Sequence, residues 1–95
     1  MFIVLLEFSG NKDAAAQFAE GHKAWLQRGF DDGVFLLAGS ILPRAGGAIV
    51  AYNTALADLQ ARVGEDPFVT QDVVAAKVLE IAPARTDERL RFLLG

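Results

Sequence analysis

The most informative absence in this sequence is cysteine. The 95-residue chain has none, which excludes disulfide bonds, thiolate metal sites and cysteine nucleophiles. It has only one histidine, and a lone histidine among scattered acids offers little for a metal site, so we expect no metal and no cofactor. A glycine-rich phosphate loop is missing too, because the Gly-Gly pair at 46–47 precedes a predicted strand rather than a helix N-terminus.

An excess of basic residues is also missing. The chain has 9 Lys and Arg against 12 Asp and Glu, which gives a formal net charge of −3. Binding to nucleic acid usually requires a basic patch, so this balance argues against a nucleic-acid partner.

No apolar stretch approaches the roughly 20 residues that a membrane span needs. The N-terminal segment MFIVLLEFSG has no basic residue ahead of its apolar run, and Glu7 interrupts that run. The segment therefore does not match a signal peptide, and we expect a cytoplasmic protein that does not associate with membranes.

Apolar residues, in contrast, are abundant. Hydrophobic types make up 53% of the chain and charged types 22%, which is typical of a globular domain. A single domain of this length buries only about 65% of the surface that its unfolded chain exposes. We therefore expect part of the apolar surface to be buried against a second subunit.

Residue periodicity predicts four strands and two helices. Apolar and aromatic residues predict a strand over residues 2–8. Apolar residues at three- and four-residue steps predict a helix over residues 12–31, with Gly33 as its left-handed C-cap. Two further strands, 34–40 and 47–53, are predicted to form a hairpin. Thr54 is predicted to cap a helix over 55–63, and the last part of residues 73–83 predicts the fourth strand.

The order β-α-β-β-α-β predicts an α+β, ferredoxin-like fold over residues 1–85, followed by a tail, 86–95, that forms a short helix or a dimer arm. Both helices then cover the same face of one antiparallel sheet. An exposed apolar face on the other side favours aggregation, so we expect two copies to pack sheet to sheet as a homodimer, a dimeric α+β barrel. Apolar residues that cannot all lie under the helices are Ile3, Leu5, Leu37, Ile49 and Leu79.

His22 is the strongest candidate for a catalytic residue. It lies on the apolar stripe of the first helix, four residues after Phe18 and three before Trp25, so it faces the sheet or a cavity beside it. An imidazole can take and give a proton near neutral pH when another group orients it. The alternative is a core or rim histidine that is hydrogen-bonded to a carbonyl, and helical spacing by itself favours this alternative.

Asp66 is the second candidate, in the segment GEDPFV at residues 64–69. An aspartate before a proline caps the local backbone, Pro67 holds it extended, and Phe68 anchors the turn in the core. The functional alternative is that this turn directs the carboxylate at His22, where it would fix the tautomer of the ring. Periodicity leaves both interpretations open.

Four other residues are candidates for a substrate pocket. Arg44, in the predicted hairpin loop, is a candidate for binding a substrate carboxylate, although an arginine in a solvated turn is more common. Ser40 ends an apolar strand, where it lines a pocket or simply terminates the strand. Trp25 and Phe68 are the candidate aromatic walls.

Four segments resemble the YCII-related (YciI-like) domain family: MFIVLLEF, HKAWL in the first helix, GVFLLAGSILPRAGGAIV and EDPF. The resemblance covers roughly residues 1–85. It implies a ferredoxin-like α+β barrel, usually dimeric and related in architecture to muconolactone isomerases. It also implies an active-site pair, which falls on His22 and Asp66 here. The clearest chemistry associated with the family is dehydrochlorination of a chlorinated hydroxyquinol, in which a base removes a proton.

The leading hypothesis is therefore a small cofactor-free lyase or isomerase that acts on a small metabolite, cyclic or aromatic-derived. His22 would be the general acid and base, and Asp66 would orient it. One alternative is a non-catalytic dimer that binds a small ligand or serves as an accessory subunit. Another is a purely structural role for both residues, with no cavity beside His22.

Overall fold

The computed structural model describes residues 1–43 and 45–94. Its strands are β1 (Phe2–Phe8), β2 (Phe35–Ile41), β3 (Gly46–Ala51) and β4 (Val74–Glu80). Its α-helices are α1 (Ala15–Asp31), α2 (Leu56–Val63) and the single turn α3 (Pro67–Thr70). Two 3₁₀ helices, Lys12–Ala14 and Glu88–Leu94, precede α1 and end the described chain.

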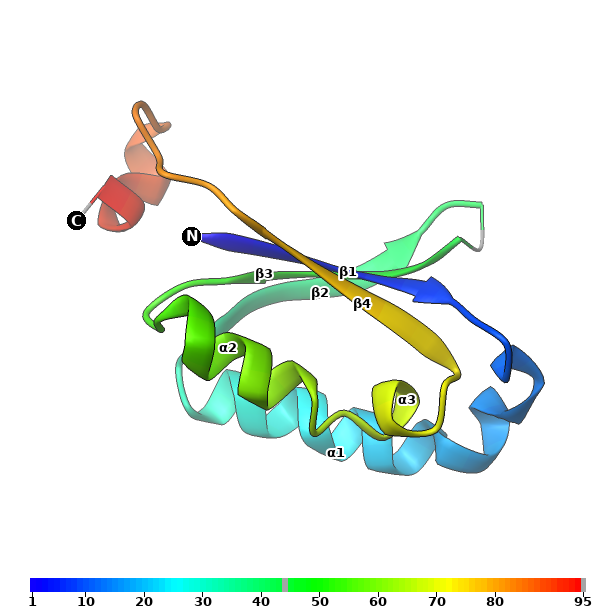
Figure 1. Cartoon of the computed structure of the whole chain (residues 1–95). Coiled ribbons are helices and arrows are strands. Elements are labelled where there is room, and N and C mark those ends of the chain that lie inside the picture. The colour runs from blue at the N-terminus through cyan, green and yellow to red at the C-terminus, as the bar shows by residue number, and fades with distance from the viewer. Residues whose placement is uncertain (44, 95) are drawn as a thin grey trace.

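The four strands form one antiparallel sheet in the order β2-β3-β1-β4. This order and the predicted β-α-β-β-α-β sequence of elements define a ferredoxin-like α+β fold, which confirms the predicted fold class. Figure 1 shows α1, α2 and α3 together on one side of the sheet, while no helix covers the central part of the other side.

The core lies between the sheet and this helical layer. Because side chains alternate along a strand, Val4 and Leu6 of β1 point into the core, while Ile3 and Leu5 between them lie on the open face and are only half-buried. Ile49 pairs with Val4 and is buried under the helices. The other four apolar residues that were expected to divide between the two faces, Ile3, Leu5, Leu37 and Leu79, lie on the open face.

Helix α1 ends as its sequence predicts. Gly33 has a positive φ of 74°, a conformation that a glycine adopts without strain. The amide of Gly33 donates to the carbonyl of Phe30, and the amide of Val34 donates to that of Gly29. These two bonds satisfy carbonyls of the last helical turn and direct the chain into β2.

The start of α2 differs from the prediction. Ala55, not Thr54, is the N-cap, and no side chain caps the helix. The Thr54 hydroxyl instead donates to the carbonyl of Ala55 at 3.3 Å. The prediction that Thr54 caps this helix is therefore wrong, because Ala55 takes the extended conformation of an N-cap.

The segment after β4 pairs with the chain start and then forms a short helix. The Ile81 amide donates to the Met1 carbonyl, and the Met1 amino group donates to the Ile81 carbonyl, both at 2.9 Å. The 3₁₀ helix that follows has a kink at Leu90. Within the described ranges, none of the helices is long and apolar enough to cross a membrane.

Candidate functional site

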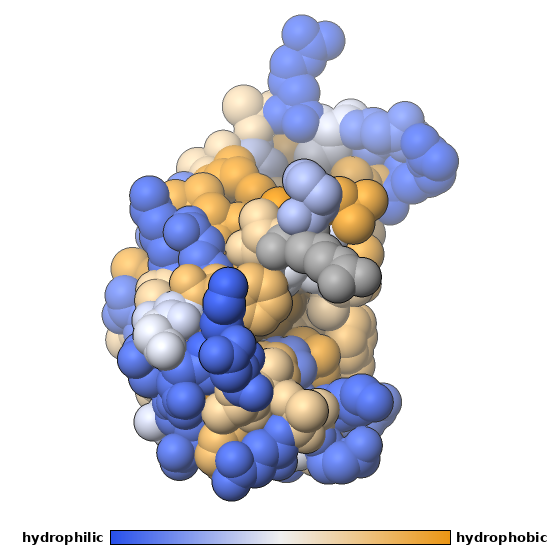
Figure 2. Space-filling view, turned by 90° about the vertical axis from the view of Figure 1, so that its right-hand side faces the viewer, coloured by the Kyte–Doolittle hydropathy of each residue, from blue (hydrophilic) through white to orange (hydrophobic). Residues whose placement is uncertain are grey.

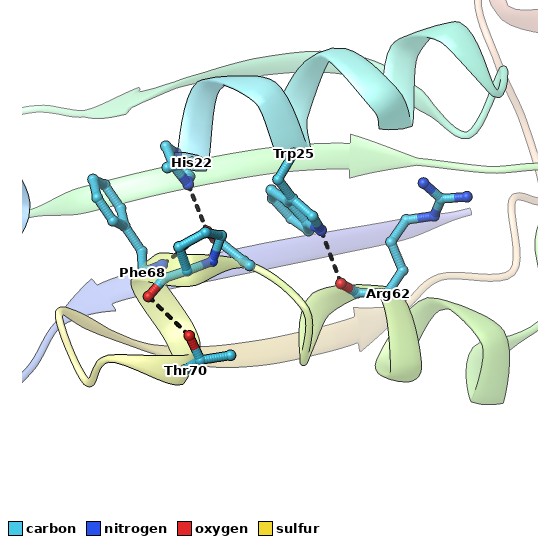
Figure 3. A network of polar contacts seen from close by, with 7 residues as sticks. His22, Trp25, Arg62, Phe68 and Thr70 are labelled. Carbon is cyan, nitrogen blue, oxygen red and sulfur yellow. Dashed lines mark hydrogen bonds and ion pairs between the residues drawn. The ribbon is translucent and has the colours of Figure 1, made fainter. Parts of the chain in front are cut away.

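The fold brings His22 and Asp66 into direct contact, although 44 residues separate them in the chain. Nδ1 of the His22 ring lies 2.8 Å from Oδ1 of Asp66. His22 projects from the middle of α1 toward the segment that links α2 to β4 (Figure 3). The sequence left the contact between His22 and Asp66 as one of two interpretations, and the structure contains it.

Asp66 reaches this position because it is the N-cap of α3. Its backbone is extended, at φ −63° and ψ 124°, and Pro67 occupies the first turn of the helix. Its Oδ1 accepts the amide of Phe68 at 3.0 Å in addition to the contact with His22. The turn interpretation and the orienting interpretation of Asp66 are thus compatible, because one oxygen atom accepts both contacts.

The carboxylate fixes where the imidazole carries its proton. With Asp66 ionised, its carboxylate only accepts hydrogen bonds, so the geometry assigns the donor role to Nδ1 of His22 and places the proton of the neutral ring on Nδ1. Asp66 is fully buried, and its Oδ2 has no hydrogen-bond partner among the described residues. Nε2 of His22 also makes no hydrogen bond to those residues, but it is not among their buried unpartnered atoms, so it remains accessible.

Two aromatic rings hold the imidazole in place. Phe68 stacks on His22 with ring centroids 4.1 Å apart and an interplanar angle of 4°. Trp25, one helical turn along α1, lies 5.9 Å from the imidazole at an angle of 26°. The side chain of His22 keeps 16% of its surface exposed. Packing and the bond to Asp66 therefore restrict the ring while leaving one edge open.

Trp25 itself is a core residue and does not line the cavity beside His22. Its Nε1 donates to the carbonyl of Arg62 at 2.9 Å (Figure 3). Its ring packs edge-on against Phe35. Trp25 was predicted as a pocket wall, and the lining of this cavity does not include it. The indole is drawn inward because its N–H finds a partner at the end of α2.

A cavity of about 310 Å³ lies between His22 and the sheet. Figure 2 views the end of the molecule at which it opens and shows a hollow with apolar walls and a hydrophilic rim. Among the described residues, His22 and Ser40 are the polar side chains in its lining. Its other lining residues are Leu6, Phe8, Leu26, Ala38, Gly39, Gly46, Gly47, Ala48, Ile49, Phe68 and Val74.

Two of the four predicted pocket residues lie in the cavity wall. Ser40 and Phe68 line the cavity beside His22, Ser40 from the sheet and Phe68 from α3. Arg44 lies outside the described residues. Leu6 and Leu26 also line the cavity and were not predicted as wall residues, although both lie on apolar stripes that face the core.

No metal site is found in the described part of the chain, where no three His, Cys, Asp or Glu residues lie close enough together to hold an ion. His22 has Asp66 as its acidic neighbour, and that carboxylate already accepts two hydrogen bonds. The arrangement is suited to moving a proton at Nε2.

The sequence matches no known protein-family model and no curated protein. The structure is similar to 5-chloro-2-hydroxyhydroquinone dehydrochlorinase (TftG) from Burkholderia phenoliruptrix AC1100, solved in complex with 2,5-dihydroxybenzoquinone. The TM-score is 0.69 at 15% sequence identity, and the match covers 85% of this chain and 93% of the other. At that identity the similarity establishes a shared fold.

Proposed function

We propose that this protein is a small cofactor-free lyase or isomerase of the YCII-related (YciI-like) type, in which His22 and Asp66 transfer a proton. The observation that carries the proposal is their 2.8 Å hydrogen bond at the wall of an apolar cavity. The shared fold with a dehydrochlorinase supports the lyase class, because loss of hydrogen chloride is an elimination that requires removal of a proton.

In the proposed mechanism, Nε2 of His22 is the atom that accepts the proton. Its lone pair is available because Nδ1 carries the hydrogen that is donated to Asp66. When Nε2 takes a proton from a C–H of the bound molecule, the released electron pair forms a new double bond and a leaving group departs with its own bonding pair. In an isomerase, the imidazolium instead returns the proton to another atom of the same molecule.

Asp66 and Phe68 have supporting roles in this step. The Asp66 carboxylate stabilises the imidazolium that forms, since it is fully buried and lies 2.8 Å from Nδ1. Phe68 stacks on the ring and holds its plane. Acid–base catalysis by a group positioned in this way typically contributes about 10²–10⁴-fold to a rate.

The cavity limits the class of substrate. Its volume of about 310 Å³ is at the lower end for ligand pockets. Since a water molecule takes up about 30 Å³ in the liquid, this space accommodates about ten water-sized groups. No Asp, Glu, Lys or Arg is among the described lining residues. A small, mainly apolar molecule, cyclic or aromatic-derived, fits these walls if its acidic hydrogen faces His22 and a hydroxyl or carbonyl faces Ser40.

The proposal includes a homodimer formed through the open face of the sheet. That face carries apolar side chains such as Leu37, which is 60% exposed. A second sheet packed about 10 Å away would remove these side chains from water.

Turnover tests the proposed function. The first compound to incubate with the protein is 5-chloro-2-hydroxyhydroquinone, with release of chloride as the measurement. A panel of small cyclic ketones and phenols follows, first screened for protection against thermal unfolding; a ligand at 100 times its Kd stabilises a protein by about 2.7 kcal/mol. We expect at least one protecting compound to be converted. If protecting compounds are all recovered unchanged, the protein is a binding or accessory protein.

A further inference from the structure

The sheet face opposite the helices is apolar and nearly free of charge. The strand register places one set of alternating side chains on this open face, with Glu7 and Lys77 as its two charged members. These two have opposite signs and lie on the neighbouring strands β1 and β4. The large apolar members of the set are Ile3, Leu5, Leu37, Ile41, Val50 and Leu79.

The C-terminal segment, residues 81–94, lies at one end of this open face. Phe92 packs edge-on against Tyr52, with ring centroids 5.3 Å apart. Tyr52 directly follows β3, and its amide still pairs with the carbonyl of Val34, so continued alternation from Val50 puts Tyr52 on the open side. In Figure 1, residues 81–94 lie on the side of the sheet opposite α1. The apolar surface therefore continues from the sheet onto the segment.

Four of the five charged side chains of this segment are paired within it, and the fifth, Arg85, makes no ion pair with a described residue. Arg89 Nε contacts Asp87 Oδ1, and Arg91 Nη1 contacts Glu88 Oε1, each at 2.9 Å. The first of these pairs holds the pKa of the Asp87 carboxyl below its ordinary value. The large apolar side chains of the segment are left about half exposed: Leu90 at 44%, Phe92 at 50% and Leu94 at 49%.

The sheet face has a small footprint for a stable interface. Four strands about 4.8 Å apart and about 23 Å long cover about 440 Å². A stable protein–protein interface buries about 800 Å² on each partner. The flat footprint of the sheet is about half of that figure, and the apolar segment at its end is positioned to add contact area.

We propose that residues 81–94 form a clasp that packs against a second copy of this chain, in one interface with the open sheet face. A two-fold interface brings the same surface against itself, so it must avoid like charges in contact. The open face satisfies this condition, and on the segment Arg85 is the one charge without an ion-pair partner among the described residues. A second sheet stacked on the first would lie beside the raised segment, whose side chains would close the end of the interface. The inference rests on the proposed dimer.

The dimer dissociation constant tests the clasp, measured by sedimentation equilibrium on the full chain. Leu90→Ser and Phe92→Ser should each raise it at least tenfold, because each change removes apolar area twice in a symmetric dimer. Leu56→Ser is the matched control, since Leu56 is a 36% exposed leucine on α2, in the helical layer, and this change should leave the constant unaltered. Far-UV circular dichroism checks the fold of each variant.

A fourth variant separates failure of the clasp from failure of the dimer. Leu37→Lys places a charge in the open sheet face and should also weaken the dimer. If Leu37→Lys weakens association while Leu90→Ser and Phe92→Ser do not, the dimer stands and the clasp is overturned. If the unaltered chain is monomeric at every concentration, the proposed dimer and the clasp both fail, whatever the outcome for turnover. If Phe92→Ser loses structure through its contact with Tyr52, Leu90→Ser decides the question.

Discussion

Replacing His22 with asparagine should reduce turnover by about 10²–10⁴-fold while leaving the fold intact. The amide nitrogen of asparagine occupies nearly the position of Nδ1 in histidine, so it can still donate to Asp66 and keep that buried carboxylate paired. It has no group that can take up a proton at the position of Nε2. The measurement is kcat on a substrate found in the turnover screen, alongside thermal unfolding.

Asp66→Asn is the companion variant and tests the orienting role. The asparagine Oδ1 can still accept the amide of Phe68, so α3 keeps its N-cap. The negative charge opposite Nδ1 is lost, and kcat should fall by more than KM changes, because the charge matters once the imidazolium forms. Full turnover in either His22→Asn or Asp66→Asn would exclude the proton-transfer pair.

The largest expected effect on stability comes from Gly46, at the start of β3 beside the cavity. Its φ is +122°, a conformation that side chains rarely adopt. An added Cβ would lie 2.0 Å from the backbone oxygen of Leu6, which cannot move without disturbing the pairing of β1 and β3. Gly46→Ala should therefore destabilise the fold by about 2–5 kcal/mol, measured as the free energy of unfolding in urea.

Gly39→Ala provides the control for this prediction. Gly39 also lines the cavity and pairs with Ala48 across the hairpin, but an added Cβ would meet no atom within 4 Å. The free energy of unfolding of Gly39→Ala should change little or rise by a few tenths of a kcal/mol, because alanine restricts the conformations of the unfolded chain. Equal losses for the two variants would show that the close approach at Leu6 does not govern this site.

The strands and the hairpin were predictable because their residue patterns are local. The stretches around Val4, Ile49 and Val78 are apolar, and short polar or glycine-containing segments separate them. Once four strands and two helices follow in this order, few topologies remain. The contact between His22 and Asp66 could be posed from the sequence only as an alternative, because helical spacing favours a core histidine and the turn explains the aspartate by itself. The resemblance to YCII-related domains is what pointed to the pair.

The remaining features depend on tertiary contacts that no local pattern contains. Helix α3 spans only four residues, Pro67–Thr70, which is too short for a periodic signal. The inward placement of Trp25 depends on the carbonyl of Arg62, 37 residues away. The cavity arises where small residues of β2 and β3, among them Gly47, lie across from α1. Its walls were therefore predicted only in part.

The central claim is that Asp66 holds the proton of His22 on Nδ1 and leaves Nε2 free to act as the base. Because the chain has a single histidine, its imidazole gives one pair of ¹⁵N resonances that needs no assignment by mutation. We predict that the spectrum of the neutral ring shows the hydrogen on Nδ1 and that this preference weakens in Asp66→Asn, because the uncharged amide oxygen at the same position is a weaker acceptor than the carboxylate. A hydrogen on Nε2 in the unaltered protein would contradict the account, since that atom could not then accept a proton from a substrate.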